Sequence, residues 1–349
     1  MIRHEALICD LDGVVYRGRQ PVEGAVSTVA ALIGKGARIA FATNNSSREP
    51  GEVLAHLRDL GISPPPRAPR STMSVATSAE AAAHLVRRLI GPGERVLAVG
   101  GPGLTSALRE VHLEPFSAAE SRRLSGVCAV VQGAASSVSW GDLAEAAFRI
   151  QQGAMWVATN GDRTIPTGRG LAPGNGAFVD VVRAAVDVEP LIAGKPEPAL
   201  YQLALERLDR RPEDTLVVGD RLDTDIAGAV RLGLDSMLVL GGAHGLAEVV
   251  HCERALRPTY LGVDLRALLV DSASDDHGAS SWPIVEMGVV HLPPGDRPDP
   301  PHLLDHVVRG AWAVVDSGGD LPHQSDAWRD LEQELATAWS AWWRAPNGR

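Results

Sequence analysis

Two aspartates, Asp10 and Asp12, stand two residues apart at the end of the apolar run A-L-I-C. In a β-strand, side chains at positions i and i+2 point to the same side, so the two carboxylates would lie close together. Like charges at the rim of an apolar core repel each other and are poorly solvated. A bound Mg²⁺ ion would neutralise this repulsion and draw a phosphate to the same place, because its ligands are carboxylates, water and phosphate oxygens.

Three further polar groups occupy comparable places in the sequence. T-N-N-S-S-R begins at Thr43, directly after the run R-I-A-F-A, and offers N–H groups and hydroxyls to an anion. Lys195 precedes a helical pattern in A-G-K-P-E-P, and Asp220 and Asp225 follow the run L-V-V-G. Lysine is rare in this chain, with two among 33 basic residues. A compact ammonium cannot be replaced by a guanidinium without moving the charge, which favours a specific role for Lys195.

Each group by itself has a simpler interpretation. D-x-D can be a solvated acidic turn, G-D-x-x-x-x-D a helix cap, T-N-N a turn and a lone lysine a surface charge. Together they supply acids for a cation, donors for an anion and a positive charge. One carboxylate could then attack phosphorus to give an aspartyl-phosphate, while the other protonates the leaving oxygen and activates water. The metal, the lysine and the loop N–H groups would stabilise the charge on the transferring phosphoryl group.

The segments that position these residues alternate between short apolar strands and longer amphipathic helices. Strands are expected at 6–9, 38–42, 95–99, 127–131, 155–158, 215–218 and 236–240, and helices at 52–60, 79–89, 143–151, 198–208 and 225–232. This alternation is typical of a doubly wound α/β fold, in which ligands bind beyond the carboxyl ends of the strands. Ser46 and Glu49 are spaced as a capping box, which would direct the positive end of the next helix toward the same place.

The composition restricts the class of protein further. A net charge of -10 argues against nucleic acid as a partner, because phosphate binding needs a basic surface. No apolar stretch approaches the roughly 20 residues that would insert into a membrane, and the start of the sequence has no secretory signal. Cys9, Cys128 and Cys252 are isolated, without metal-type spacing, and are interpreted as thiols in a reducing cytoplasm. We therefore expect a cytoplasmic protein.

The four polar groups resemble the motif set of the haloacid dehalogenase-like hydrolases. D-L-D-G-V resembles motif I, T-N-N-S motif II, K-P motif III and G-D-R-L-D-T-D motif IV. The resemblance implies that Asp10 is the nucleophile and that Asp12 is the general acid and base. It also implies two sets of binding residues. The phosphoryl group would contact Thr43, Asn44, Asn45 and Lys195. Mg²⁺ would be held by Asp10, Asp220 and the backbone carbonyl of Asp12, with Asp225 ligating the ion or holding a metal-bound water.

About 150 residues separate motifs II and III, so the resemblance implies an inserted α/β cap domain of the C2 type. The stretches A-T-N-G-D-R-T-I-P and L-A-P-G-N-G resemble the subclass of NagD-like and p-nitrophenyl-phosphatase-like enzymes. Arg163, in the first stretch, would bind a second anionic group of the substrate or else be a solvated loop charge. The implied domains are a Rossmann-like core (1–77 and 191–270), the cap (78–190), a linker (271–281) and a C-terminal extension (282–349).

The C-terminal extension differs in composition from the rest, because it holds six of the eight tryptophans. A helix is expected at 326–343, and the segment is too small for a core of its own. It would pack on the main body or on a second copy, so a homodimer is one expected partner. V-V-G-D-R-L-D-T-D-I and L-R-P-T-Y resemble actinobacterial glycerol-3-phosphate phosphatases, which implies that the extension is part of an acetyltransferase fold. It has no pyrophosphate loop for acetyl-CoA, which favours a stabilising role.

The expected function is Mg²⁺-dependent hydrolysis of a small phosphorylated metabolite, and the resemblance implies glycerol 3-phosphate. A sugar phosphate, a nucleotide monophosphate or 2-phosphoglycolate would suit the same catalytic groups. A phosphotransferase or mutase would use the same aspartyl-phosphate with a second hydroxyl in place of water. A signalling receiver is disfavoured by D-x-D and by the large insertion before Lys195. A binding protein with a decayed site is disfavoured by the intact set of acids.

Overall fold

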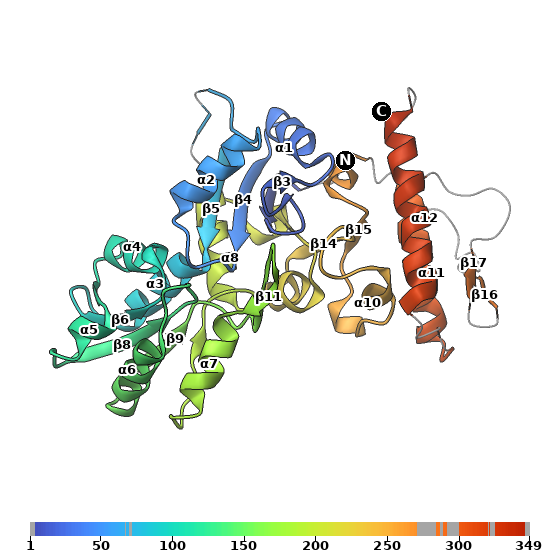
Figure 1. Cartoon of the computed structure of the whole chain (residues 1–349). Coiled ribbons are helices and arrows are strands. Elements are labelled where there is room, and N and C mark those ends of the chain that lie inside the picture. The colour runs from blue at the N-terminus through green and yellow to red at the C-terminus, as the bar shows by residue number, and fades with distance from the viewer. Residues whose placement is uncertain are drawn as a thin grey trace. The chain divides into compact units, whose positions relative to one another are not determined.

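The computed structural model describes residues 4–66, 68–69, 72–270, 284–286, 289–291, 300–319, 321 and 325–345 (Figure 1). Contacts between residues divide the chain into two compact units. The first unit combines Met1–Ala37 with Pro212–Arg349, and the second unit is Arg38–Arg211. The expected linker at 271–281 lies outside the described residues. The domain boundaries expected from the sequence, with a cap at 78–190, stay a prediction.

A parallel sheet forms the centre of the first unit. Its strands β1 (Ala6–Cys9), β13 (Thr215–Gly219), β14 (Asp235–Val239) and β15 (Tyr260–Gly262) lie in the order β15-β14-β13-β1. All residues of β1 and β13 are buried, as expected for apolar strands that are covered on both faces. The register pairs Cys9 with Val218, so the carboxyl ends of β1 and β13 lie side by side. Asp10 and Asp220 are the residues that follow these two ends.

Short helices and turns connect the strands of the first unit. They are α1 (Ala25–Gly34), η2 (Pro212–Asp214), the π-helix η3 (Leu222–Ile226), α9 (Ala227–Leu232), α10 (Leu246–Val250), η4 (Arg254–Leu256), η5 (Leu265–Leu269) and the hairpin of β2 (Tyr16–Arg17) with β3 (Gln20–Pro21). The α-helix expected at 225–232 begins only at Ala227, because the preceding residues form the π-helix that carries Asp225.

The second unit contains two further parallel arrangements. β4 (Arg38–Thr43) pairs in parallel with β5 (Met73–Thr77). A five-stranded sheet has the order β12-β9-β8-β6-β7. Its strands are β6 (Arg95–Val99), β7 (Glu114–Phe116), β8 (Val127–Gln132), β9 (Met155–Ala158) and β12 (Leu191–Ile192), and β10 (Thr164–Thr167) forms a separate hairpin with β11 (Gly170–Pro173). The predicted α/β class with parallel strands is confirmed.

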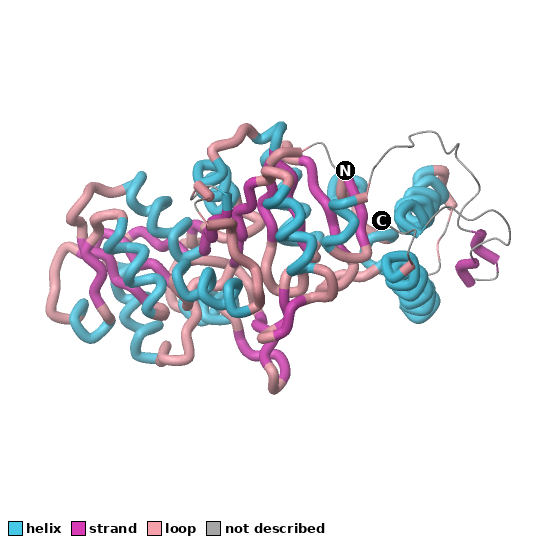
Figure 2. The backbone as a smooth tube through the Cα atoms, turned by 90° about the horizontal axis from the view of Figure 1, so that it is seen from above, coloured by secondary structure: helices cyan, strands magenta, loops and turns pink. Residues whose placement is uncertain are grey.

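Helices follow most strands of the second unit, and strands and helices alternate along the tube in Figure 2. The helices are α2 (Pro50–Asp59), α3 (Ser78–Leu89), α4 (Pro102–Glu110), α5 (Ala118–Ser121), α6 (Trp140–Gln151), α7 (Asn175–Arg183) and α8 (Pro198–Leu208). The prediction of a capping box formed by Ser46 and Glu49 is wrong, because the box lies three residues later, at Glu49 and Glu52. Glu49 is itself the N-cap of α2 and exchanges bonds with Glu52, because Pro50 occupies the first helical position.

The C-terminal extension packs on the rest of the first unit, to which it belongs. It contains the hairpin β16 (Ile284–Glu286) and β17 (Val289–His291), followed by α11 (Pro300–Asp316) and α12 (Ser325–Arg344). Leu304, Val308 and Trp328 share one apolar core with Leu246 and Val249 of α10. Of the two packing arrangements expected, the structure therefore shows contact with the main body. Within the described part of the chain, no helix is long and apolar enough to cross a membrane.

Trp328 is a large side chain through which α12 joins this apolar core. Its side chain is fully buried, and Trp→Ala changes in a core cost about 3–5 kcal/mol of the free energy of unfolding. We expect Trp328→Ala to lower stability by that amount in urea unfolding followed by fluorescence. Trp140→Ala is the matched control, because Trp140 is 79% exposed and should change stability by less than about 0.5 kcal/mol. Equal losses in the two variants would contradict the packing of α12.

Candidate active site

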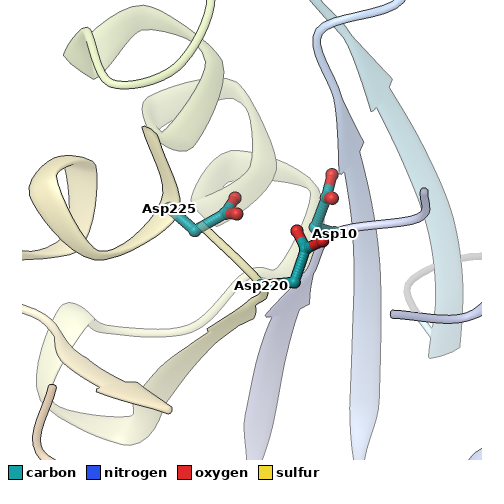
Figure 3. A group of neighbouring side chains, drawn as sticks. All are labelled: Asp10, Asp220 and Asp225. Atoms are coloured by element: carbon teal, nitrogen blue, oxygen red, sulfur yellow. The ribbon is translucent and has the colours of Figure 1, made fainter. Parts of the chain in front are cut away.

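Three carboxylates come together at the carboxyl end of the first unit's sheet. Asp10 follows β1, whereas Asp220 and Asp225 follow β13 (Figure 3). One oxygen of each side chain lies within 4.8 Å of the other two. Asp220 and Asp225 are buried and Asp10 is half-buried. Three like charges at this distance in a poorly solvated place repel each other, so the group is suited to a cation.

The strand pairing and a π-turn position two of these residues. The N–H of Asp10 donates to the carbonyl of Val218 at 2.8 Å, which continues the β1–β13 ladder by one residue. In η3 the N–H groups of Asp225 and Ile226 both donate to the carbonyl of Arg221, at 3.0 and 3.1 Å. A Cβ on Gly219 would lie 2.2 Å from the Cβ of Asp225. The glycine at the end of β13 therefore makes room for the turn that aims Asp225 inward.

Asp220 is held by the loop that follows β14. The N–H of Ala243 donates to Oδ2 of Asp220 at 2.7 Å, and the N–H of His244 donates to its carbonyl at 3.1 Å. A Cβ on Gly242 would lie 1.9 Å from that Oδ2, and one on Gly13 would lie 2.2 Å from it. Gly13 also has a positive φ of 87°, which favours glycine. Two glycines thus allow the backbone to approach the carboxylate closely.

The donor set fits a hard divalent cation. All three side chains offer carboxylate oxygens, which Mg²⁺ prefers, and neither sulfur nor imidazole belongs to the group. Mg²⁺ usually keeps several waters and takes substrate oxygens for its remaining positions. Among the described residues, these three acids form a group that could hold such an ion.

The side chain of Asp12 does not belong to this group. It is exposed, and its backbone forms an isolated bridge with Tyr16 in the turn after β1. The N–H of Gly13 donates to the carbonyl of Tyr16 at 2.9 Å, which closes this turn. The expectation that the side chains of Asp10 and Asp12 lie close together stays a prediction. The strand ends at Cys9, and the Asp12 side chain beyond it is exposed whereas that of Asp10 is half-buried.

In the second unit, the amide of Asn44 ties motif II to motif III. Its Oδ1 accepts from the N–H of Lys195 at 2.8 Å, and its Nδ2 donates to the carbonyl of Lys195 at 3.1 Å. The Lys195 side chain is buried, and so is that of Thr43 at the end of β4. Asn45 accepts from the N–H of Ser47 at 2.9 Å, which closes a turn after Thr43. Two hydrogen bonds thus join the predicted residues Asn44 and Lys195, and Oγ1 of Thr43 accepts from the N–H of Asn45 at 3.1 Å.

The sequence did not identify two further residues that form hydrogen bonds with Asn44. Asp162 accepts from Nδ2 of Asn44 at 3.1 Å, and Asn160 donates to the carbonyl of Asn44 at 2.7 Å. Asn175 at the start of α7 in turn donates to the carbonyl of Asn160 at 2.8 Å. The stretch A-T-N-G-D-R is far from motif II in the sequence, and only the fold shows that its polar residues contact Asn44. Arg163 is mostly exposed and pairs with Asp180 at 2.8 Å.

None of the cysteines belongs to the carboxylate group, although the Cys9 thiol donates to the backbone carbonyl of Asp10 at 3.2 Å. None of Cys9, Cys128 and Cys252 is in a disulfide. Burial raises the pKa of the Cys252 thiol to about 11, so it is protonated near neutral pH. A bond to Glu94 raises the pKa of Cys128 as well. Both thiols lack the lowered pKa that a nucleophilic cysteine requires.

Comparison with known proteins identifies the family. A family model for haloacid dehalogenase-like hydrolases matches residues 7–114, and a second model of HAD-hydrolase-like proteins matches residues 192–268. A D-glycerol 3-phosphate phosphatase of Mycobacterium tuberculosis is 47% identical over 269 residues, which are 77% of this chain and 72% of that protein. The chain belongs to the haloacid dehalogenase-like hydrolases. The predicted family is thereby confirmed.

Other phosphatases are similar to this chain in sequence or in structure. An acid sugar phosphatase of Staphylococcus aureus is 35% identical over 271 residues, covering 78% of this chain and 99% of that protein. The crystal structure of a glycerol phosphate phosphatase of M. tuberculosis in complex with magnesium superimposes with a TM-score of 0.75 at 42% identity. It covers 89% of this chain and 91% of that chain. The crystal structure of a thermostable NPPase double mutant from Geobacillus stearothermophilus superimposes with a TM-score of 0.66 at 32% identity. The match covers 76% of this chain and 98% of that chain.

Proposed function

We propose that this hydrolase is a Mg²⁺-dependent phosphatase of small phosphomonoesters and that glycerol 3-phosphate is its substrate. The group of Asp10, Asp220 and Asp225, with carboxylate oxygens within 4.8 Å of one another, is the observation that carries the proposal. Such a group supports a metal site at the sheet edge where α/β proteins bind ligands. The relatives whose names include a phosphatase activity support the type of reaction.

The residues of motif I perform the covalent chemistry in this proposal. A carboxylate oxygen of Asp10 attacks phosphorus, the ester P–O bond breaks, and the protonated Asp12 gives its proton to the leaving alkoxide. Asp12, now a carboxylate, takes a proton from water, whose oxygen attacks the phosphorus of the aspartyl-phosphate. Inorganic phosphate leaves, and Asp10 is restored as a carboxylate. The exposure of Asp12 suits an exchange of protons with the leaving group and water.

Asp10, Asp220 and Asp225, together with the carbonyl of Asp12, would hold the Mg²⁺ ion. When bound, the ion supplies positive charge that offsets the three carboxylates and the phosphate. The motif residues Thr43, Asn44, Asn45 and Lys195 are proposed to bind the phosphoryl group. Since the Asn44 side chain is bonded to Lys195 and Asp162, its contribution would come from its main chain. Lys195 would contribute the compact charge that balances nucleophile and phosphate.

The substrate is assigned by similarity and by the insertion between motifs II and III. Residues 78–190 are proposed to be the cap that selects the substrate. In this proposal, Arg163 leaves its ion pair with Asp180 and binds an anionic group of the substrate. Glycerol 3-phosphate is favoured because the M. tuberculosis phosphatase is more similar to this chain than the acid sugar phosphatase, at 47% against 35% identity. A cytoplasmic location agrees with a small phosphorylated metabolite as substrate and with thiols outside disulfides.

The proposal is tested by phosphate release from glycerol 3-phosphate, a hexose phosphate, a nucleoside monophosphate and 2-phosphoglycolate, with Mg²⁺ or with a chelator. We expect release only with Mg²⁺ and the highest kcat/KM for glycerol 3-phosphate. A higher kcat/KM for another member of the panel would overturn the substrate assignment alone. Absence of release from every member would overturn the proposed hydrolysis.

A further inference from the structure

The loop between β14 and α10 contacts both the candidate metal site and the C-terminal extension. At its centre, the N–H of Ala243 donates to Oδ2 of Asp220 at 2.7 Å. At its end, the N–H of Leu246 donates to Oε2 of Glu332 in α12 at 2.7 Å. Ala243 and Leu246 are three residues apart, so a displacement of one end of this short loop is passed to the other. Glu332 is thus linked to Asp220 through a single piece of backbone.

The bond to Glu332 fixes the first turn of α10. Leu246 is the first residue of this helix, and its N–H has no partner within the helix. Glu332 satisfies it from another element, while Glu248 accepts from the N–H of Gly245 at 2.9 Å. A Cβ on Gly245 would lie 2.5 Å from Oε2 of Glu332, so the carboxylate rests against the backbone. The loop is therefore held by α12 at the point where it enters α10.

α12 is itself firmly anchored on the first unit. Nε1 of Trp339 donates to Oδ2 of Asp264 at 2.9 Å, and Trp339 is buried. Leu331 and Leu335, which flank Glu332, lie in the same apolar core as Leu246. Glu332 is therefore presented by a packed helix rather than by a surface segment, and its position is set by the extension as a whole.

We propose that Glu332 is a positioning residue for the Mg²⁺ site, through which the C-terminal extension holds the loop that orients Asp220. The inference rests on the proposed function in one respect, namely that Asp10, Asp220 and Asp225 bind Mg²⁺. It gives the extension a role in the hydrolase reaction beyond stabilising the fold. Partners that orient metal ligands contribute to affinity even though they do not touch the ion.

The contact needs the hydrogen-bond acceptor of Glu332 rather than its charge. Burial raises the pKa of this carboxyl and the neighbouring Glu248 raises it further, whereas the bond from Leu246 acts in the opposite direction. The amide oxygen of a glutamine can accept the same bond from Leu246 without the charge. Glu332→Gln should therefore preserve the position of the loop, whereas Glu332→Ala should release it.

The test is direct Mg²⁺ binding to the full-length protein by titration calorimetry, without substrate. We expect Glu332→Ala to weaken binding about 5-fold, less than the roughly 10–100-fold typical of direct partners of metal ligands. Glu332→Gln should bind Mg²⁺ as the unmodified chain does. Asp330→Ala, which removes an exposed acid from the same helix, is the charge-matched control and should leave affinity unchanged.

A second variant acts on the other side of the same contact. Gly245→Ala places a methyl group where Oε2 of Glu332 lies and should lower Mg²⁺ affinity in the same way. Unchanged affinity in both Glu332→Ala and Gly245→Ala would overturn the positioning role. Equal loss in Glu332→Gln and Glu332→Ala would also overturn it, because the acceptor would then be irrelevant. If the unmodified chain binds no Mg²⁺, the proposed metal site fails together with this inference.

Discussion

Asp10→Asn is expected to lower phosphate release by about a thousand-fold or more, the scale on which removal of a hydrolase nucleophile acts. An amide oxygen cannot attack phosphorus as a carboxylate does, so no aspartyl-phosphate would form. The change is nearly isosteric, and the bond from the N–H of Asp10 to Val218 belongs to the backbone and would remain. We therefore expect a folded protein without turnover, measured by phosphate release and by circular dichroism.

Asp223→Asn is the matched control for this variant. Asp223 is an exposed acid in the same motif as Asp220, and it pairs with Arg221 at 2.7 Å instead of with the carboxylate group. Exposed ion pairs contribute about 0–1 kcal/mol, so this variant should keep both fold and activity. Comparable activity of Asp10→Asn and Asp223→Asn would exclude Asp10 as the nucleophile.

Gly242→Ala is expected to weaken Mg²⁺ binding by about 10–100-fold, the range for changes to direct partners of metal ligands. The added Cβ would lie 1.9 Å from Oδ2 and 2.3 Å from Cβ of Asp220. Atoms cannot approach that closely, so either Asp220 turns away or the loop moves and breaks the bond from Ala243. The Mg²⁺ concentration that gives half-maximal activity should rise accordingly, and calorimetry should show the same loss.

Gly241→Ala makes the same chemical change one residue earlier. Its Cβ would meet Arg17 at 3.5 Å and the carbonyl of Val263 at 3.6 Å, which are ordinary van der Waals distances. We expect this variant to bind Mg²⁺ as the unmodified chain does. If both glycine variants bind with full affinity, the close approach of the loop to Asp220 has no part in the metal site.

The sequence predicted the strands that carry the site because they are continuous apolar runs. β1, β6 and β9 have the predicted bounds, and buried parallel strands leave this pattern in any sequence. Asp10 and Asp220 could be placed together because both follow such runs. The exposure of Asp12 could not be predicted from spacing alone, since it follows from the end of the strand at Cys9 and from the turn at Gly13, whose φ is positive.

The contacts between distant segments were not predictable from local pattern. The bonds of Asn44 to Asp162 and Lys195 join residues 118 and 151 positions away. The bond from Leu246 to Glu332 spans 86 positions. Such contacts depend on tertiary packing, and a single polar residue in a loop or on a helix carries no periodic signal for them. The helix α11 was missed for a related reason, because its start lies within a proline-rich stretch that is typical of a loop.

The covalent step on Asp10 is tested most directly by trapping the phosphorylated enzyme during turnover. The enzyme turns over glycerol 3-phosphate in the presence of Mg²⁺, and the reaction is quenched with acid. Borohydride then reduces an aspartyl-phosphate to homoserine, and mass spectrometry identifies the position of the homoserine in the sequence. We predict homoserine at Asp10, none at Asp12 and none when Mg²⁺ is withheld. Homoserine at Asp12, or turnover without homoserine at either position, would contradict the account.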